Sequence, residues 1–237
     1  MKLFQNLKDI ELAREKLKDF KNVVPVQMLL LLVCFLAKGI MDLFEVPYGN
    51  EITELLFFSV LGIYVYLLWD MLRNYTKSRA LLICLLILIM GTFLIGVVFV
   101  NPFFTLLNPL EFRIATALIM TTLLFVEISV VYFTITEIFK RNLAIGERMW
   151  GAACIYLITG IAFGSFYEII DIISLTSLDF QTPLGTHHFI KSITFSFNIL
   201  AGTEIPYVCN ELVTNVTIIE ALWGNLFIVF VVGRLLI

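Results

Sequence analysis

The stretch that decides the fold is residues 186–200, THHFIKSITFSFNIL, which lies between two much longer apolar segments. It is apolar and rich in hydroxyl side chains, but its 15 residues are too few to cross a bilayer, which takes about 20 residues of helix. Thr186 is a suitable N-cap, and Gly202 is a suitable helix stop. We therefore predict a short helix that is either re-entrant or interfacial, followed by irregular backbone at residues 201–206.

The chain as a whole has the composition of an integral membrane protein. Of its 237 residues, 60% are hydrophobic and 15% are charged, and the mean hydropathy is +0.96. Because a soluble domain carries about 25% charged residues, these figures exclude a soluble enzyme. The net charge of −3 supplies no basic face for phosphate groups, so nucleic acid is excluded as a partner.

Six apolar segments are long enough to span a membrane. Their lengths fit helices, not the roughly ten-residue alternating strands of a membrane β-barrel. The predicted spans are residues 23–44, 54–72, 80–100, 114–136, 149–167 and 213–234. The predicted fold class is an all-α membrane protein with six transmembrane helices, in which a re-entrant pore helix lies between the fifth and the sixth.

Lysine and arginine indicate the orientation. All of the 16 basic residues except Lys38, Arg113 and Lys191 lie in segments that six crossings place on one side. Short segments rich in these residues stay in the cytoplasm, so both termini are predicted to be cytoplasmic and the chain to lie in the plasma (inner) membrane. Residues 1–22 mix charged and apolar positions and are predicted to form a cytoplasmic amphipathic segment.

From about residue 141 to its end, the chain resembles the bacterial six-span members of the potassium-channel superfamily. The matching segments are residues 145–168, IGERMWGAACIYLITGIAFGSFYE, and residues 219–235, IEALWGNLFIVFVVGRL. In such relatives the last two spans bracket a re-entrant pore helix and a selectivity filter. The resemblance implies a homotetramer that conducts inorganic cations through a pore domain at residues 141–237. Residues 23–140 would then form a four-helix peripheral membrane domain in contact with lipid.

The residues at the filter position depart from the family. The family has a Gly-Tyr-Gly-Asp filter, whose carbonyl oxygens replace the water shell of the ion. Only Gly202 coincides with a filter glycine, and Leu200, in place of the first glycine, disfavours the backbone angles of a filter. The filter region of this chain is Asn198, Ile199, Leu200, Ala201, Gly202 and Thr203.

This departure leaves more than one function open. We expect monovalent cation conduction with weak or altered selectivity. The alternative is a non-conducting, channel-like membrane scaffold or sensor that kept the fold while its filter decayed. A small-solute transporter is less favoured, because the two halves of the sequence show no internal repeat.

Two residues are candidates for direct contact with ions. Four copies of Asn198 would meet on the axis of a tetramer and coordinate a partly hydrated ion, or each Asn198 would cap the end of the short helix. Four copies of Glu204 would form an acidic ring at the outer mouth that concentrates cations. The alternative for Glu204 is a solvated loop acid.

A second group of residues has expected roles in support and gating. Glu168 and Glu220 lie near the outer ends of the fifth and sixth spans, and ionisable groups inside a membrane usually face the bundle or water. Glu220 is expected to hydrogen-bond the backbone of the short helix and hold the filter region; the alternative is direct contact with ions. Gly224 would let the sixth helix bend or pack closely against a neighbour. The expected lining of the inner cavity is Asn225, Phe227 and Ile228.

The remaining ionisable residues give weaker signals. Glu127 lies midway along the fourth span, and Lys38 or Arg113 is its expected partner. His187 and His188 either sense pH or cap the short helix and face water. The cysteines show no metal-ligand spacing and no catalytic motif is present, so we expect no enzyme activity, no metal and no cofactor.

Overall fold

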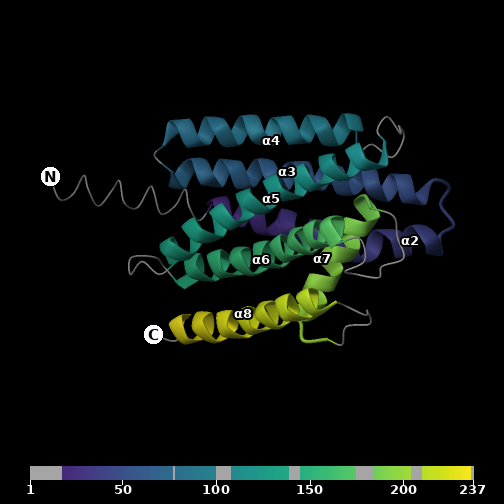
Figure 1. Cartoon of the computed structure of the whole chain (residues 1–237). Helices are drawn as coiled ribbons and strands as arrows, with labels where there is room; N and C mark the ends of the chain where they lie inside the picture. Colours follow the sequence, from purple (N-terminus) through teal and green to yellow (C-terminus); the bar gives the residue numbers. More distant parts are fainter. Residues whose placement is uncertain are drawn as a thin grey trace.

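The computed structural model describes most of the chain, and within the described residues it is helical without any strand (Figure 1). These residues are 18–76, 78–99, 108–138, 145–174, 184–203 and 210–235. The described chain is helical from residue 18 into a π-helical segment, η1. The elements are η1 (Val33–Ala37), α2 (Lys38–Leu43), α3 (Gly49–Tyr75), α4 (Arg79–Phe99), α5 (Pro109–Ile138), α6 (Ile145–Ser174), α7 (Thr186–Leu200) and α8 (Glu211–Leu235).

Six of the described helical segments are long and apolar enough to cross a membrane, which confirms the six predicted spans. They are Lys18–Leu43, Gly49–Tyr75, Arg79–Val97, Pro109–Thr136, Arg148–Ser174 and Glu211–Phe230. The chain is therefore a multi-pass membrane protein by its length and composition. Consecutive spans run in opposite directions, so residue 18 and the C-terminal end of α8 lie at the same end of the bundle (Figure 1).

Several helices extend beyond the predicted spans. Residues 18–22, predicted as the end of the amphipathic segment, are helical and continuous with the first candidate span, described as Lys18–Leu43; residues 1–17 lie outside the described part of the chain. The fifth span does not end at residue 167 but continues to Ser174. The charges of Glu168 and Asp171 indicated a loop, but both side chains are buried.

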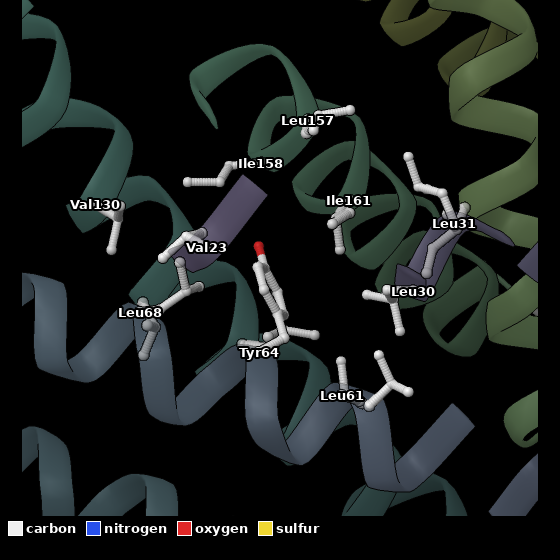
Figure 2. Packing of buried hydrophobic residues seen from close by; sticks show 14 of the residues in the cluster. Val23, Leu30, Leu31, Leu61, Tyr64, Leu68, Val130, Leu157, Ile158 and Ile161 are labelled. Carbon is white, nitrogen blue, oxygen red and sulfur yellow. The ribbon is translucent and has the colours of Figure 1, made fainter. Parts of the chain in front are cut away.

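The main hydrophobic core joins the first four spans to α6 and α7. Figure 2 shows Tyr64 and Leu68 of α3 beside Val130 of α5 and Ile158 and Ile161 of α6, all of which are fully buried. Phe189, Ile190 and Ile193 of α7 belong to the same core. The two sides of the predicted domain boundary at residue 140 thus share one core.

The π-helical segment η1 lies where the first span meets α7. π-Helical turns are rare and occur often at functional sites. Phe35 of η1 packs edge-to-face on Phe197 of α7, with the ring centroids 6.0 Å apart. The first span therefore contacts the short helix directly.

Candidate functional site

The short helix has the predicted length, and its two ends are capped by glycines. It covers Thr186–Leu200, with Gly185 and not Thr186 at the N-cap position. At its C-terminal end, the N–H of Thr203 donates to the carbonyl of Asn198 and that of Gly202 donates to the carbonyl of Ile199, both at 3.0 Å. Gly202 has a φ of +70°. This is the hydrogen-bond pattern of a Schellman motif, which ends a helix at a left-handed glycine, so Gly202 is confirmed as the stop.

Helix α7 runs antiparallel along α6 and ends beside its middle. His188, near the start of α7, bonds to Glu168 and Asp171 near the end of α6. Two turns later Ser196 donates to the carbonyl of Gly160 at 2.7 Å. Because α6 covers Ile145–Ser174, the C-terminal end of α7 reaches only about half of its length.

The α7 cradle is the name used below for the surface on which α7 lies. It consists of Gly160, Gly164, Glu168 and Asp171 of α6 and Glu220 and Gly224 of α8. Figure 1 shows α7 between the ribbons of α6 and α8. The cradle combines two kinds of contact, close backbone approach at the glycines and buried polar bonds at the acids.

The three glycines of the α7 cradle leave no room for a side chain. A Cβ atom at Gly164 would lie 2.9 Å from the Cα of Ile193, and one at Gly224 would lie 2.9 Å from the Cδ2 of Leu200. A Cβ at Gly160 would overlap the ring of Phe197. Gly160 and Gly164 are four residues apart, the spacing by which small residues let membrane helices approach closely. The backbone of α7 therefore packs closely against the backbone of α6 at Gly164.

Glu168, Asp171, His188 and Ser192 form a buried polar cluster at the first turns of α7. The Nδ1 atom of His188 lies 2.6 Å from an oxygen of Glu168, and its Nε2 atom lies 2.9 Å from an oxygen of Asp171. Ser192 donates to the same oxygen of Glu168 at 2.9 Å. A carboxylate only accepts, so both ring nitrogens donate and His188 is an imidazolium cation.

The carboxylates set the protonation of His188. Burial alone lowers the pKa of His188, but the hydrogen bonds to Asp171 and Glu168 outweigh this effect and raise the pKa to about 9. His188 was expected either to sense pH or to cap the helix and face water; it faces neither water nor the helix end, and its side chain is 2% exposed. The neighbouring His187 is partly exposed and lies 3.3 Å from Glu54 of α3.

We expect the stability of the protein to fall as the pH rises from about 6.5 to 9. Folding raises the pKa of His188 from 6.5 to about 9, so its ion pairs stabilise the fold fully below the lower value and are lost through the upper one. The unfolding midpoint in detergent micelles, measured across this range, should decrease for the wild type and change less for His188→Gln. The control His187→Gln should keep the wild-type slope, and a flat wild-type profile would contradict a charged His188.

Glu220 of α8 closes a second buried network nearer the C-terminal end of α7. Tyr167 of α6 donates to one oxygen of Glu220 at 2.6 Å, and the other oxygen bonds to the hydroxyl of Ser196. Ser196 has a single hydroxyl proton, and it also bonds to the carbonyl of Gly160 at 2.7 Å. The hydroxyl of Ser196 therefore bridges the backbone carbonyl of Gly160 on α6 and the carboxyl of Glu220 on α8. The partner of Glu220 on α7 is thus the side chain of Ser196 and not the helix backbone.

Glu127 has different partners from those expected. Tyr64 of α3 donates to one of its oxygens at 3.0 Å, and Ser165 of α6 lies 3.4 Å from the other. Arg113, one of the expected partners, donates instead to the carbonyl of Ile172, and Lys38 is exposed. The expected ion pair is wrong, because hydroxyl groups on two neighbouring helices satisfy the buried carboxyl.

The predicted filter residues form the last turn and the cap of α7. Ile199 and Leu200 are buried, Asn198 is partly buried, and Ala201, Gly202 and Thr203 are exposed. Glu204, the predicted outer-mouth acid, lies outside the described residues. Their pore-lining role stays a prediction.

The predicted residues of the sixth span have two different environments. Asn225 and Ile228 are exposed, whereas Gly224 is buried against Leu200. Phe227 is half-buried and its ring stacks on Tyr156 of α6 and on Trp223, with centroids 6.3 Å apart in both pairs. Only Asn225 and Ile228 therefore point away from the helices of the same chain.

Several residues of the site were missed in the sequence. Asp171, Ser192, Ser196 and Tyr167 carry its hydrogen bonds, but none was singled out. The available signal was the interval of four residues between His188, Ser192 and Ser196, which places them on one face of a helix. Within the described residues, no group of three His, Cys, Asp or Glu side chains is arranged to hold a metal ion.

Comparison with models of known families, with curated proteins and with solved structures found no match for this chain.

Proposed function

We propose that the chain is the subunit of a tetrameric pore-loop ion channel of the plasma membrane, which conducts monovalent cations with weak or altered selectivity. The observation that carries this proposal is the seating of α7 in the α7 cradle. With 15 residues, α7 is about 23 Å long, less than the roughly 30 Å of a bilayer core. It ends beside the middle of α6 and is followed by α8, as a re-entrant pore helix would be.

The exposure of α8 supports an assembly. Only 22% of the apolar window of α8 is buried within the chain, against 67% for α6. Asn215 and Asn225 are exposed on α8, and uncovered carboxamides are unfavourable in lipid hydrocarbon. In a tetramer with α8 at the axis, these side chains would face water or a neighbouring subunit.

The end of α7 determines what kind of filter is possible. The carbonyls of Asn198 and Ile199 accept hydrogen bonds from Thr203 and Gly202, so they belong to a helix cap and do not form the extended row of free carbonyls of a potassium filter. This cap favours passage of hydrated ions over strict potassium selectivity. It also favours the second candidate, a non-conducting channel-like scaffold or sensor.

Planar-bilayer recordings of the purified full-length chain test the proposal. We expect cation currents with little preference between potassium and sodium, and an increase of about twofold in cation conductance for Asn225→Asp, because a ring of carboxylates attracts cations. Asn50→Asp, an exposed asparagine at the start of α3, makes the same charge change away from α8 and should leave the current unchanged.

The current through a particle of known symmetry separates the two candidates. A four-fold particle that carries no current under any cation gradient would reject the channel and favour the scaffold or sensor. A monomeric particle would reject both proposals, because neither the axis nor the packing of α8 would exist.

A further inference from the structure

A long groove lies between α3, α4 and α5, away from the α7 cradle. Its volume is about 600 Å³, within the range of about 300–1,000 Å³ that is usual for ligand sites. Along α3 it extends from Leu55 to Trp69, which at 1.5 Å per residue is about 21 Å. This length exceeds the roughly 15 Å of one hydrocarbon leaflet. Figure 1 shows α3 and α4 side by side, with α5 running obliquely across α3.

The groove presents almost no polar group to an occupant. Three of its hydroxyl residues, Ser59, Thr92 and Thr122, bond to carbonyls four residues earlier in their own helices, at 2.8–2.9 Å. Tyr66 also lines the groove and is exposed, and Gly62 and Gly96 line it without side chains. The groove therefore fits a long apolar chain and offers few polar groups to a polar ligand.

One end of the groove carries positive charge. Trp69 lines that end and donates from its indole nitrogen to the carbonyl of Leu82 at 3.4 Å, which joins α3 to α4. The guanidinium of Arg73, one turn further along α3, lies 5.7 Å from the centre of the Trp69 ring. Arg79, the first residue of α4, is exposed nearby in the chain. Asp70 pairs with Arg73 at 2.7 Å and offsets part of this charge.

We propose that this groove is a binding site for one anionic phospholipid, whose acyl chain lies along α3 from Trp69 toward Leu55 and whose phosphate lies beside Arg73 and Arg79. An acyl chain has apolar surroundings both in the bilayer and in the groove, so the hydrophobic effect does not drive it into the groove. Close packing with the groove binds the acyl chain, and the arginines select the headgroup. Basic residues near a membrane surface attract anionic lipids. The bound lipid would fill the space between α3, α4 and α5 and brace them against each other.

Quenching of Trp69 fluorescence by lipids with brominated acyl chains tests this site. The chain has three tryptophans, so the double variant Trp150→Phe/Trp223→Phe reports Trp69 alone. We expect brominated phosphatidylglycerol, added to the full-length protein in micelles, to quench saturably at one lipid per chain. It should bind about tenfold more tightly than brominated phosphatidylcholine.

Two substitutions separate the groove from the headgroup site. Ser59→Phe fills the groove and should lower the affinity for both lipids at least fivefold, because the phenyl ring occupies space that the acyl chain needs. Ser129→Phe is the matched control, because Ser129 of α5 also bonds to the carbonyl four residues earlier at 2.8 Å but does not line the groove. Arg73→Gln should remove most of the preference for phosphatidylglycerol, whereas Lys21→Gln on the first span should not.

If Ser59→Phe fails to fold, quenching in the Trp150→Phe/Trp223→Phe protein with the groove otherwise unchanged decides the proposal. Quenching that rises without saturation and is equal for the two lipids would show ordinary surrounding lipid and overturn the site. A preference for phosphatidylglycerol that persists in Arg73→Gln would overturn the assignment of the headgroup to this end of the groove. Neither result depends on whether the protein conducts ions.

Discussion

Gly164→Ala is expected to lower the free energy of unfolding by about 2 kcal/mol, because it forces α7 away from α6. A Cβ at this position would lie 2.9 Å from the Cα and 3.1 Å from the backbone nitrogen of Ile193. Backbone atoms do not move aside by a change of side-chain rotamer, so α7 itself has to shift. Overpacking of this kind costs roughly 1–3 kcal/mol.

The shift would also lengthen the polar bonds on both sides of Gly164. Ser192 lies 2.9 Å from Glu168, and Ser196 lies 2.7 Å from the carbonyl of Gly160. Each bond weakens steeply as the helix moves outward. If the protein conducts cations as proposed, we therefore expect the cation current of this variant to fall together with its stability.

Two other glycines provide controls for this prediction. A Cβ at Gly224 would be crowded by Leu200 Cδ2, the far end of a flexible side chain, and would meet the Leu200 backbone only at ordinary contact distance, so Gly224→Ala should cost less. Gly91→Ala meets no atom within 4 Å and should be neutral or stabilising, since alanine favours a helix interior by up to about 1 kcal/mol. Chemical unfolding in one detergent measures all three variants. A Gly164→Ala variant as stable as Gly91→Ala would contradict the seating of α7.

The spans and the short helix were predictable because their signals are local. Apolar length and flanking charges located the six spans, and Gly202 marked the end of α7 at the correct residue. The same local reasoning ended the fifth span too early at Glu168. A charge inside an apolar segment indicates a boundary unless a partner neutralises it, and the partner of Glu168 is His188, 20 residues further along the chain.

The pairings of the site were not predictable for the same reason. Nothing in the sequence connects Glu127 with Tyr64, which is 63 residues away, or Tyr167 with Glu220, which is 53 residues away. The choice among partners depends on which helix faces touch. The helix lengths limit this choice but do not determine it.

Glu168→Gln is expected to cost about 3 kcal/mol of folding free energy, the largest effect of a single conservative substitution in the α7 cradle. Glu168 is fully buried, and one of its oxygens accepts bonds from both His188 and Ser192. Glutamine has the same shape but no charge, so the imidazolium of His188 keeps Asp171 as its carboxylate partner and loses the other. Breaking a buried ion pair on one side costs about 3–5 kcal/mol.

An exposed ion pair gives the matched control for Glu168→Gln. Asp70 and Arg73 lie 2.7 Å apart, with side chains 30% and 54% exposed. Asp70→Asn makes the same kind of carboxylate-to-amide change, but an exposed pair contributes only about 0–1 kcal/mol. If the two variants unfold at the same denaturant concentration, the His188 cluster is not a buried ion pair.

The double variant Glu168→Gln/His188→Gln distinguishes lost charge pairing from lost packing. Removing the imidazolium together with the carboxylate leaves no buried cation with one missing partner, so the double variant should lose less than the sum of the two single losses, by at least about 1 kcal/mol. Additive losses would mean that the two side chains act only by filling space. Glu168→Gln should also flatten the fall of stability between pH 6.5 and 9 that the raised pKa of His188 predicts, because the carboxylate that holds the proton on the ring is gone.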